Sequence, residues 1–583
     1  MKKLISFLLL FLILLFATGL RLYKLSEIPP GLNRDEAAIG YTAFSLLETG
    51  KDEYGKLWPI SLKSFGDWKL PVYVYLTIPS VAIFGLNEFA VRLPSVICSL
   101  LTIIFVYFLT KKIFKSNAIA LTICTLISIS PWNIFFSRVA SEANATVLLV
   151  TIAIFTFFVT EKKFYWLILG SICLGLSLLT YHGNHVFTPL LFIGCLILFK
   201  NKFLSKPWGW VSVGVFCIIS IFIYGQTLFS ADKTKISGLT PLGDISLVHE
   251  NINLNRIIYP NQFFGRLLNN KVIFLGEQIT KNYLRSFSPE FLFISGGTNL
   301  QHNIPDFGNL YKIEGVLILI GLFLLFYRKE KTAWFWLYWI LISPIAGSLT
   351  KDAPHSARMY AIIPAIYVII GYGLIKGLNL IKNLRIKKIV ILIVGLAFIV
   401  DIGLFTGRYF ILFSYKAYKS WGLAYKEMIL KLDIYKSNYD LIYISRPDYS
   451  PYIYYLFYNQ ASPQLFQTYA IHYPETSEGF SHVKSFDGVV YEKNNWTDEL
   501  LIPDNLYIDW AESIPSGATN SATYITKDKY TQMKKSGIDI SKIKVGDVIT
   551  SKIIDKVIAP DTSPIFYLIS TQVGTSSALI KNF

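Results

Sequence analysis

Residues 4–20 read LISFLLLFLILLFATGL, and Asn33-Arg34-Asp35-Glu36 follow after a short connection. An uninterrupted apolar run of this kind is typical of a helix that crosses a hydrocarbon core, which takes roughly 17–25 residues. Adjacent carboxylates beside a membrane surface have little structural use, so Asp35 and Glu36 are candidates for a functional site. The alternative is an ordinary solvated loop. The stretch therefore predicts a membrane helix with a polar site at one of its ends.

The composition excludes a soluble globular protein. Of 583 residues, 53% are hydrophobic and 16% are charged, and the mean hydropathy is +0.46. The start Met1-Lys2-Lys3 and the apolar run are similar to a secretory signal, but no small-residue cleavage pattern precedes Arg21 and further apolar runs follow. The sequence predicts an α-helical polytopic membrane protein that keeps its first helix.

Apolar runs predict about eleven membrane spans, and the charges between them predict the orientation. Basic residues fall in alternate loops, and the positive-inside rule places these loops and the N-terminus in the cytoplasm. The net charge of +17 is therefore mostly a topology signal, and no continuous basic face supports nucleic-acid binding. The predicted spans are 4–22, 89–110, 117–136, 143–160, 164–181, 185–199, 209–229, 312–327, 332–350, 360–380 and 388–412. The basic loops contain Lys111, Lys112 and Lys115; Lys162 and Lys163; Lys200, Lys202 and Lys206; Arg328, Lys329 and Lys331; and Lys382, Arg385, Lys387 and Lys388.

With an odd number of spans, the remaining loops and the C-terminal tail face the outside of the cell membrane. In the tail, strand-like segments at 440–445 and 488–491 are separated by helical or turn-rich stretches such as the aromatic run 452–458. We therefore predict a membrane domain, 1–413, and an extracytoplasmic α/β domain, 414–583. The predicted outer loops are 23–88, 137–142, 182–184, 230–311 and 351–359.

The cysteines and two of the histidines do not predict a metal site or a disulfide. All five cysteines lie within predicted spans and lack a C-x-x-C pairing. His182 and His185 flank a short outer turn, where a metal site is one interpretation. Hydrogen-bonded loop histidines are the favoured one, because no carboxylate or cysteine lies nearby in the sequence.

Three further outer segments carry charges suited to a phosphate or a reacting hydroxyl. Lys69 precedes Pro71, which predicts the start of a helix that re-enters the membrane. His355 and Arg358 are three residues apart and share a face if a helix begins there, and arginine forms a bidentate fork to phosphate. Glu142 adds a carboxylate. The alternative for Lys69 and for the His355–Arg358 pair is that they only reach lipid headgroups. The alternative for Glu142 is an ordinary acid at the N-terminus of a helix.

Together these motifs resemble bacterial members of the glycosyltransferase C (GT-C) superfamily. The resemblance is carried by Asp35-Glu36 after the first helix, by DWKLPVY at 67–73 and by NEFAVRLPS at 87–95. Within the superfamily the chain looks most like the branch of protein O-mannosyltransferases and lipid A aminoarabinose transferases. In layout the resemblance covers roughly residues 1–410.

The resemblance implies an inverting transfer of a sugar from a polyprenyl-phosphate donor to an extracytoplasmic acceptor, which could be protein, lipid or cell-envelope glycan. It implies that Asp35 is the catalytic carboxylate and that Lys69, His355 and Arg358 face the donor phosphate. Glu36 belongs to the predicted catalytic pair, and Glu142, Asp67 and Tyr41 are candidates for a second carboxylate or an acceptor contact. The chain departs from some relatives in lacking a basic residue at Ala37 or Ala38 and a second proline at Leu70. These departures leave the donor sugar open.

The residue types suit this chemistry. An acceptor hydroxyl needs a carboxylate to take its proton, and a departing lipid phosphate needs fixed cations. No nucleotide-binding fingerprint is present, and an activated sugar carried on lipid needs none. Asp35, Glu36 and Glu142 could instead hold Mg²⁺ or Mn²⁺, but we favour a reaction without cofactor or metal.

Two alternative functions stay open at this point. A transporter or flippase of lipid-linked sugars would also have many spans, but it tends to carry charges near the middle of the membrane. A polymerase or ligase of lipid-linked glycans would use the same donors.

Overall fold

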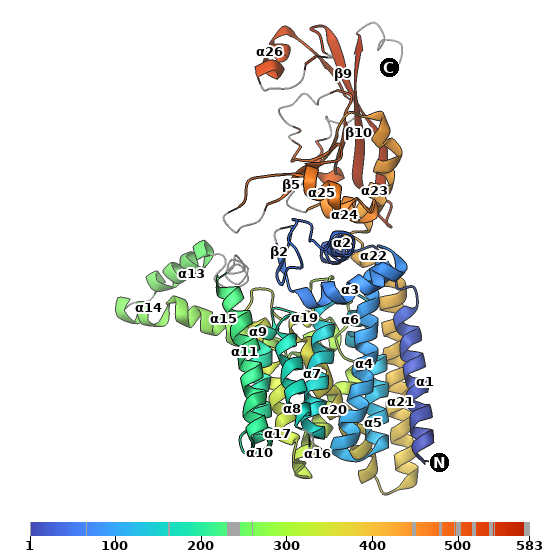
Figure 1. Cartoon of the computed structure of the whole chain (residues 1–583), viewed down its shortest axis with the longest axis vertical. Coiled ribbons are helices and arrows are strands. Elements are labelled where there is room, and N and C mark those ends of the chain that lie inside the picture. Colours follow the sequence, from blue (N-terminus) through green and yellow to red (C-terminus); the bar gives the residue numbers. More distant parts are fainter. Residues whose placement is uncertain are drawn as a thin grey trace.

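The computed structural model contains a helical bundle with a sheet domain stacked on one end (Figure 1). It describes residues 2–65, 67–160, 164–229, 245–258, 261–445, 450–476, 481–494, 496, 503–515, 521–535, 540–541 and 543–575. Lys162, Lys163 and loop residues 230–244, which figure in the predicted topology, lie outside the described residues. The N-terminus lies at the end of the bundle farthest from the sheet domain.

Every predicted membrane segment contains a helix. Among the described residues, six helices are long and apolar enough to cross a membrane, and a seventh span results if α5 and α6, bent by 61°, are counted together. The chain is a multi-pass membrane protein, while the total of eleven spans stays a prediction. The bundle helices are α1 (Lys2–Leu22), α4 (Glu88–Phe114), α5 (Asn117–Ile129), α6 (Pro131–Ser137), α7 (Glu142–Val159), α8 (Tyr165–Ser177), α9 (Asn184–Leu198), α10 (Lys200–Phe203), α11 (Pro207–Phe229), α16 (Lys312–Tyr327), α17 (Ala333–Ile342), α18 (Ile345–Ser348), α20 (Ile363–Leu380) and α21 (Leu384–Thr406).

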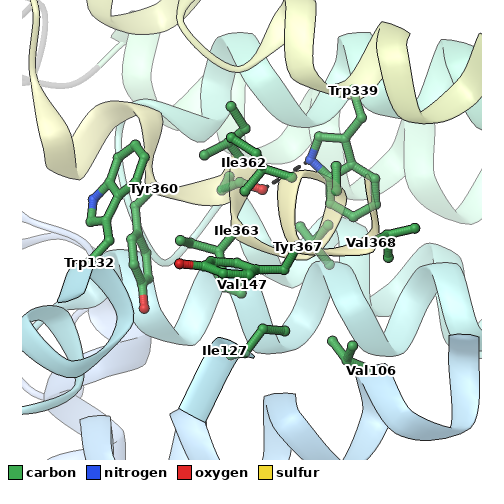
Figure 2. Packing of buried hydrophobic residues seen from close by; sticks show 14 of the residues in the cluster. Val106, Ile127, Trp132, Val147, Trp339, Tyr360, Ile362, Ile363, Tyr367 and Val368 are labelled. Atoms are coloured by element: carbon green, nitrogen blue, oxygen red, sulfur yellow. Dashed lines mark hydrogen bonds between the residues drawn. The ribbon is translucent and has the colours of Figure 1, made fainter. Parts of the chain in front are cut away.

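Helix α20 forms the centre of the bundle. All its residues from Ile363 to Gly373 are buried, as expected for a helix that is apolar on every side. Figure 2 shows its side chains among those of α4, α5, α6, α7 and α17. The indole N–H of Trp339 donates to the carbonyl of Ala361 at 3.0 Å, which satisfies its polar atom inside the core.

Close packing of α20 on α16 depends on glycine. A Cβ atom added at Gly373 would lie 2.5 Å from the carbonyl oxygen of Leu317 on α16. Small residues at such a contact let two helix backbones approach, which is a common basis of association inside membranes.

Short elements cover the end of the bundle nearest the sheet domain (Figure 1). The first loop forms α2 (Arg34–Thr49), the antiparallel strands β1 (Leu62–Ser64) and β2 (Asp67–Lys69), and α3 (Pro71–Phe84). Pro71 occupies the first turn of α3, as the sequence predicted. Later segments that the sequence predicts to be outer loops form α13 (Ile245–Ile258), α14 (Gln262–Leu268), α15 (Lys271–Arg285) and α19 (Ser356–Met359).

The C-terminal domain has the predicted α/β character. Its eight-stranded sheet has the order β4-β5-β6-β3-β7-β10-β9-β8, in which β3 pairs in parallel with β6 and β7 and the other pairings are antiparallel. The boundary at 413/414 stays a prediction. The strands are β3 (Ile442–Ile444), β4 (Ile471–His472), β5 (Val483–Phe486), β6 (Val489–Tyr491), β7 (Leu506–Trp510), β8 (Ser521–Tyr524), β9 (Asp547–Ile558) and β10 (Pro564–Thr575), and the helices are α22 (Phe413–Ala417), α23 (Leu423–Tyr435), α24 (Tyr452–Tyr458), α25 (Pro463–Tyr469) and α26 (Lys527–Lys535).

The sheet domain is packed tightly against the first outer loop. A Cβ atom at Gly40 of α2 would lie 2.6 Å from the Phe457 ring of α24, so only glycine allows this approach. The Tyr452 hydroxyl donates to Oε1 of the buried Glu53 at 3.3 Å. Burial, reinforced by the charge of Asp52, raises the pKa of Glu53 to about 8. The junction therefore encloses a carboxyl group that is mostly protonated at neutral pH.

Candidate active site

A cavity of about 530 Å³ lies at the end of the bundle that carries the short outer elements. Five segments predicted to share one side of the membrane contribute to its wall, so their grouping at one end is confirmed. The compartment that this end faces stays a prediction. Polar lining residues include Asp35, Lys69, Glu142, His302, His355 and Arg358.

Asp35 is held at the start of α2. The Asn33 side chain caps this helix by accepting from the backbone N–H of Glu36 at 2.9 Å. An acidic residue in the first turn is favoured by the helix dipole, so the local sequence supports this position. The Asp35 side chain is 45% exposed, which leaves it accessible from the cavity.

Lys69 forms an ion pair with Asp35. Its Nζ lies 2.7 Å from Oδ1 of Asp35, and the lysine side chain is only 6% exposed. The strand pair β1–β2 and the turn into α3 place it there, and its Nζ also lies 5.3 Å from the centre of the Phe65 ring. A buried cation and an accessible carboxylate thus face the same cavity.

His355 and Arg358 lie together, as their spacing predicted. Nδ1 of His355 accepts the backbone N–H of Arg358 at 3.4 Å and caps the short helix α19. Burial lowers the pKa of His355 well below its usual value, helped by the neighbouring His302 and Arg358. Because Nδ1 is the acceptor, the neutral ring carries its hydrogen on Nε2 and is a donor there.

Arg358 contacts a half-buried hydroxyl and an exposed carboxylate. Nη1 donates to Oγ1 of Thr350 at 2.6 Å, and Nη2 lies 3.5 Å from Oδ2 of Asp352, whose side chain is mostly exposed. Arg358 is 12% exposed and Asp352 is 52% exposed, so the pair is open to solvent only on the carboxylate side. An anion in the cavity could compete with Asp352 for the guanidinium.

His302 was not identified from the sequence. Its ring centre lies 4.5 Å from that of His355, and burial lowers its pKa to about 4. It lies in a long outer loop without a local motif, and only the folded structure brings it to His355. The two rings add a neutral, hydrogen-bonding wall beside Arg358.

Glu36 is placed differently from the prediction that it acts in catalysis. It does not line the cavity; its two oxygens are bound by the guanidinium of Arg92 at 3.1 and 2.9 Å, and Oε1 also accepts the N–H of Ala140 at 2.7 Å. Both charged side chains are buried. The reason is geometric, since consecutive residues on a helix point about 100° apart.

Arg92 fixes the connection that leads to Asp35. Besides Glu36, it donates to the carbonyls of Leu25 at 2.8 Å, Pro29 at 3.0 Å and Gly31. A guanidinium that is buried with this many acceptors is well satisfied. It therefore holds the chain before α2, and with it the position of Asp35.

The other predicted residues are divided between the cavity and its surroundings. Glu142 begins α7 and lines the cavity, whereas the Tyr41 hydroxyl points to the sheet domain and donates to the carbonyl of Ala461 at 3.1 Å. Asp67 lies in β2, but its side chain is outside the described part of the structure.

His182 and His185 have the hydrogen bonds expected of loop histidines. Their Nε2 atoms lie 3.0 Å from the carbonyl oxygens of Trp68 and Leu178, respectively. Within the described ranges, no three His, Cys, Asp or Glu side chains are grouped to hold a metal. Independence from metal stays a prediction.

Comparisons with known proteins agree with this architecture. Residues 69–224 match the family model of dolichyl-phosphate-mannose-protein mannosyltransferases. The crystal structure of ArnT from Cupriavidus metallidurans bound to undecaprenyl phosphate aligns over 97% of this chain and 98% of that one, with 10% identity and a TM-score of 0.50. The chain has the GT-C fold. The resemblance predicted from the sequence is thereby confirmed.

A longer protein of known structure also matches the chain. The Archaeoglobus fulgidus oligosaccharyltransferase in the apo form is 15% identical, with a TM-score of 0.47 over 78% of this chain. The chain spans 64% of the length of that enzyme. No curated protein matches the chain significantly.

Proposed function

We propose that the protein is an inverting glycosyltransferase that moves a sugar from a polyprenyl-phosphate donor to an acceptor hydroxyl outside the cell membrane. The observation that supports this most is the meeting of an accessible carboxylate, Asp35, with Lys69 and Arg358 around one cavity. The matched family is described as using dolichyl-phosphate-mannose, and the ArnT structure holds undecaprenyl phosphate.

The reaction needs one base and one anion site. The acceptor oxygen attacks the anomeric carbon from the face opposite the phosphate, and its proton passes to Asp35. The bond from the anomeric carbon to the phosphate oxygen breaks, and the carrier phosphate leaves with the electron pair. Inversion follows from a single displacement.

The ion pair between Asp35 and Lys69 represents the resting state in this proposal. In this state the ammonium of Lys69 occupies Oδ1 of Asp35. Donor phosphate would draw Lys69 toward itself, together with Arg358 and the Nε2–H of His355. Asp35 would then become available to the acceptor, so donor binding would activate the base.

The experiment is to incubate the purified protein in lipid nanodiscs with defined polyprenyl-phosphate sugars and an acceptor mixture, and to measure released carrier phosphate. Asp35→Asn should lower release by roughly 10²- to 10⁴-fold. Asp306→Asn should not, because Asp306 is an exposed acid that pairs with Lys416 and Arg408 away from the cavity. Equal release from both variants would contradict the proposal. Movement of intact donor across vesicles without release would favour a transporter instead.

A further inference from the structure

Helices α13, α14 and α15, here called the outer-loop arm, extend sideways from the cavity end of the bundle (Figure 1). The arm is unusual in its exposed apolar side chains. Ile257 and Val272 are 80% and 79% exposed, values that a soluble loop seldom shows for several neighbouring apolar residues. The other exposed apolar residues of the arm are Leu254, Ile258, Phe263, Phe264, Leu267, Leu268 and Leu284.

The charges of this part of the arm have one sign. Between residues 254 and 272 the chain contains Arg256, Arg266 and Lys271 and no aspartate or glutamate. Apolar side chains interspersed with cations are the pattern of segments that lie in the interface of a bilayer and attract anionic headgroups.

Helix α11 of the bundle also exposes apolar side chains. Helix α11 precedes the arm in the chain, meets the criteria for a membrane span, and has exposed apolar side chains at Ile218 and Ile221. In Figure 1 both α11 and α15 reach the cavity end of the bundle. A bilayer that surrounds α11 would therefore reach the arm at its headgroup level.

The arm is also connected to the cavity. Leu275 and Ile279 of α15 form part of the cavity wall. Farther along α15, the Asn282 side chain donates to the carbonyls of Ser348 at 3.2 Å and Thr350 at 3.1 Å. Thr350 is also the residue whose hydroxyl accepts from Arg358.

We propose that the outer-loop arm inserts its apolar face into the lipid interface and forms the side entrance through which a prenyl chain reaches the cavity. The partner of this surface is the bilayer, and its anionic headgroups complement the three cations. The proposal that the arm inserts into the bilayer depends only on its exposed apolar side chains. The proposal that it forms an entrance for the prenyl chain rests on the proposed function. α15 connects the exposed apolar side chains to the cavity, because Val272 near its start is exposed and Asn282 near its end donates to Thr350, a partner of Arg358.

Insertion is tested by fluorescence quenching. A fluorophore would be attached at Leu267→Cys or at Leu465→Cys in a Cys217→Ser background, since Cys217 is the exposed native cysteine among the described residues. Leu465 is the matched control because it is 53% exposed, against 51% for Leu267, and lies on α25 of the sheet domain. Nanodiscs with headgroup-level nitroxide lipids should quench the label at 267 strongly and the label at 465 weakly. Equal quenching, or a cross-link at 267 between two copies of the chain, would overturn insertion.

The entrance is tested by kinetics with donors of different chain length. Leu267→Ser should raise KM roughly tenfold for a long-chain donor, as loss of one leucine from an apolar environment implies, while KM for a short water-soluble donor stays constant. Leu465→Ser should change neither value. Equal KM changes for both donors would refute the entrance. Absence of all transfer by the wild-type protein would refute the proposed function and leave the quenching result valid.

Discussion

Asp35 and Glu36 are adjacent in sequence, and the structure predicts that they fail in different ways when their charges are removed. Asp35→Asn removes a half-exposed carboxylate from the buried Lys69, so it should cost some stability, but less than the loss of a pair in which both groups are buried. Its effect should appear in turnover, which should fall by roughly 10²- to 10⁴-fold if Asp35 is the base.

Glu36→Gln should act on stability. It leaves the buried guanidinium of Arg92 without its counter-charge, and breaking a buried pair costs about 3–5 kcal/mol. Glutamine keeps one oxygen, which can still accept from Arg92 or from Ala140, but it places an N–H₂ group where Oε2 accepted a bond. We therefore expect a loss near the lower end, about 3 kcal/mol.

The assay measures both quantities on the same samples. Thermal unfolding of each variant in nanodiscs gives the stability change, and release of carrier phosphate at a low temperature, where both variants are folded, gives turnover. A stable Glu36→Gln protein that is less active than Asp35→Asn would refute this reasoning and return Glu36 to the catalytic pair. Near-normal turnover by Asp35→Asn would leave the enzyme without an identified base.

Three further predictions concern the phosphate site, pH and topology. Lys69→Ala and Arg358→Ala should each weaken donor binding by about 1.5–3 kcal/mol in an equilibrium binding assay, because each removes a charged hydrogen bond; unchanged affinity would mean that these cations only reach lipid headgroups. The pKa of Glu53 in the folded state is raised to about 8, so its contribution to stability is complete below about pH 4.3 and is lost as the pH rises to 8, by at most about 1.4 kcal/mol per pH unit. Glu53→Gln should therefore flatten the plot of unfolding temperature against pH over this range, and an unaltered plot would exclude an effect of this carboxyl group. Impermeant thiol reagents added outside whole cells should label a cysteine at Leu465 but not one at Lys329, and the reverse pattern would invert the predicted topology.

Much of the site could be predicted from the sequence, because charged residues beside membrane spans usually mark either topology or a functional site. Apolar runs located the helices, and alternating basic loops grouped the residues that line the cavity, including Asp35, Lys69 and Glu142. His302 and the position of Glu36 could not be predicted in this way. Both depend on contacts between segments far apart in the chain: His302 with His355, and Glu36 with Arg92.

The partners of Arg92 also bear on the order in which the protein is made. The carbonyls of Leu25, Pro29 and Gly31 and the carboxylate of Glu36 all precede Arg92 in the chain. All of these acceptors have therefore been synthesised by the time α4 enters the membrane. Ala140, whose N–H donates to Glu36, follows within about the next 50 residues. The arginine need not wait in the bilayer for a counter-charge. Arg92 can thus hold the connection that leads to Asp35 early in synthesis, before Arg358 and the sheet domain that packs on α2 emerge.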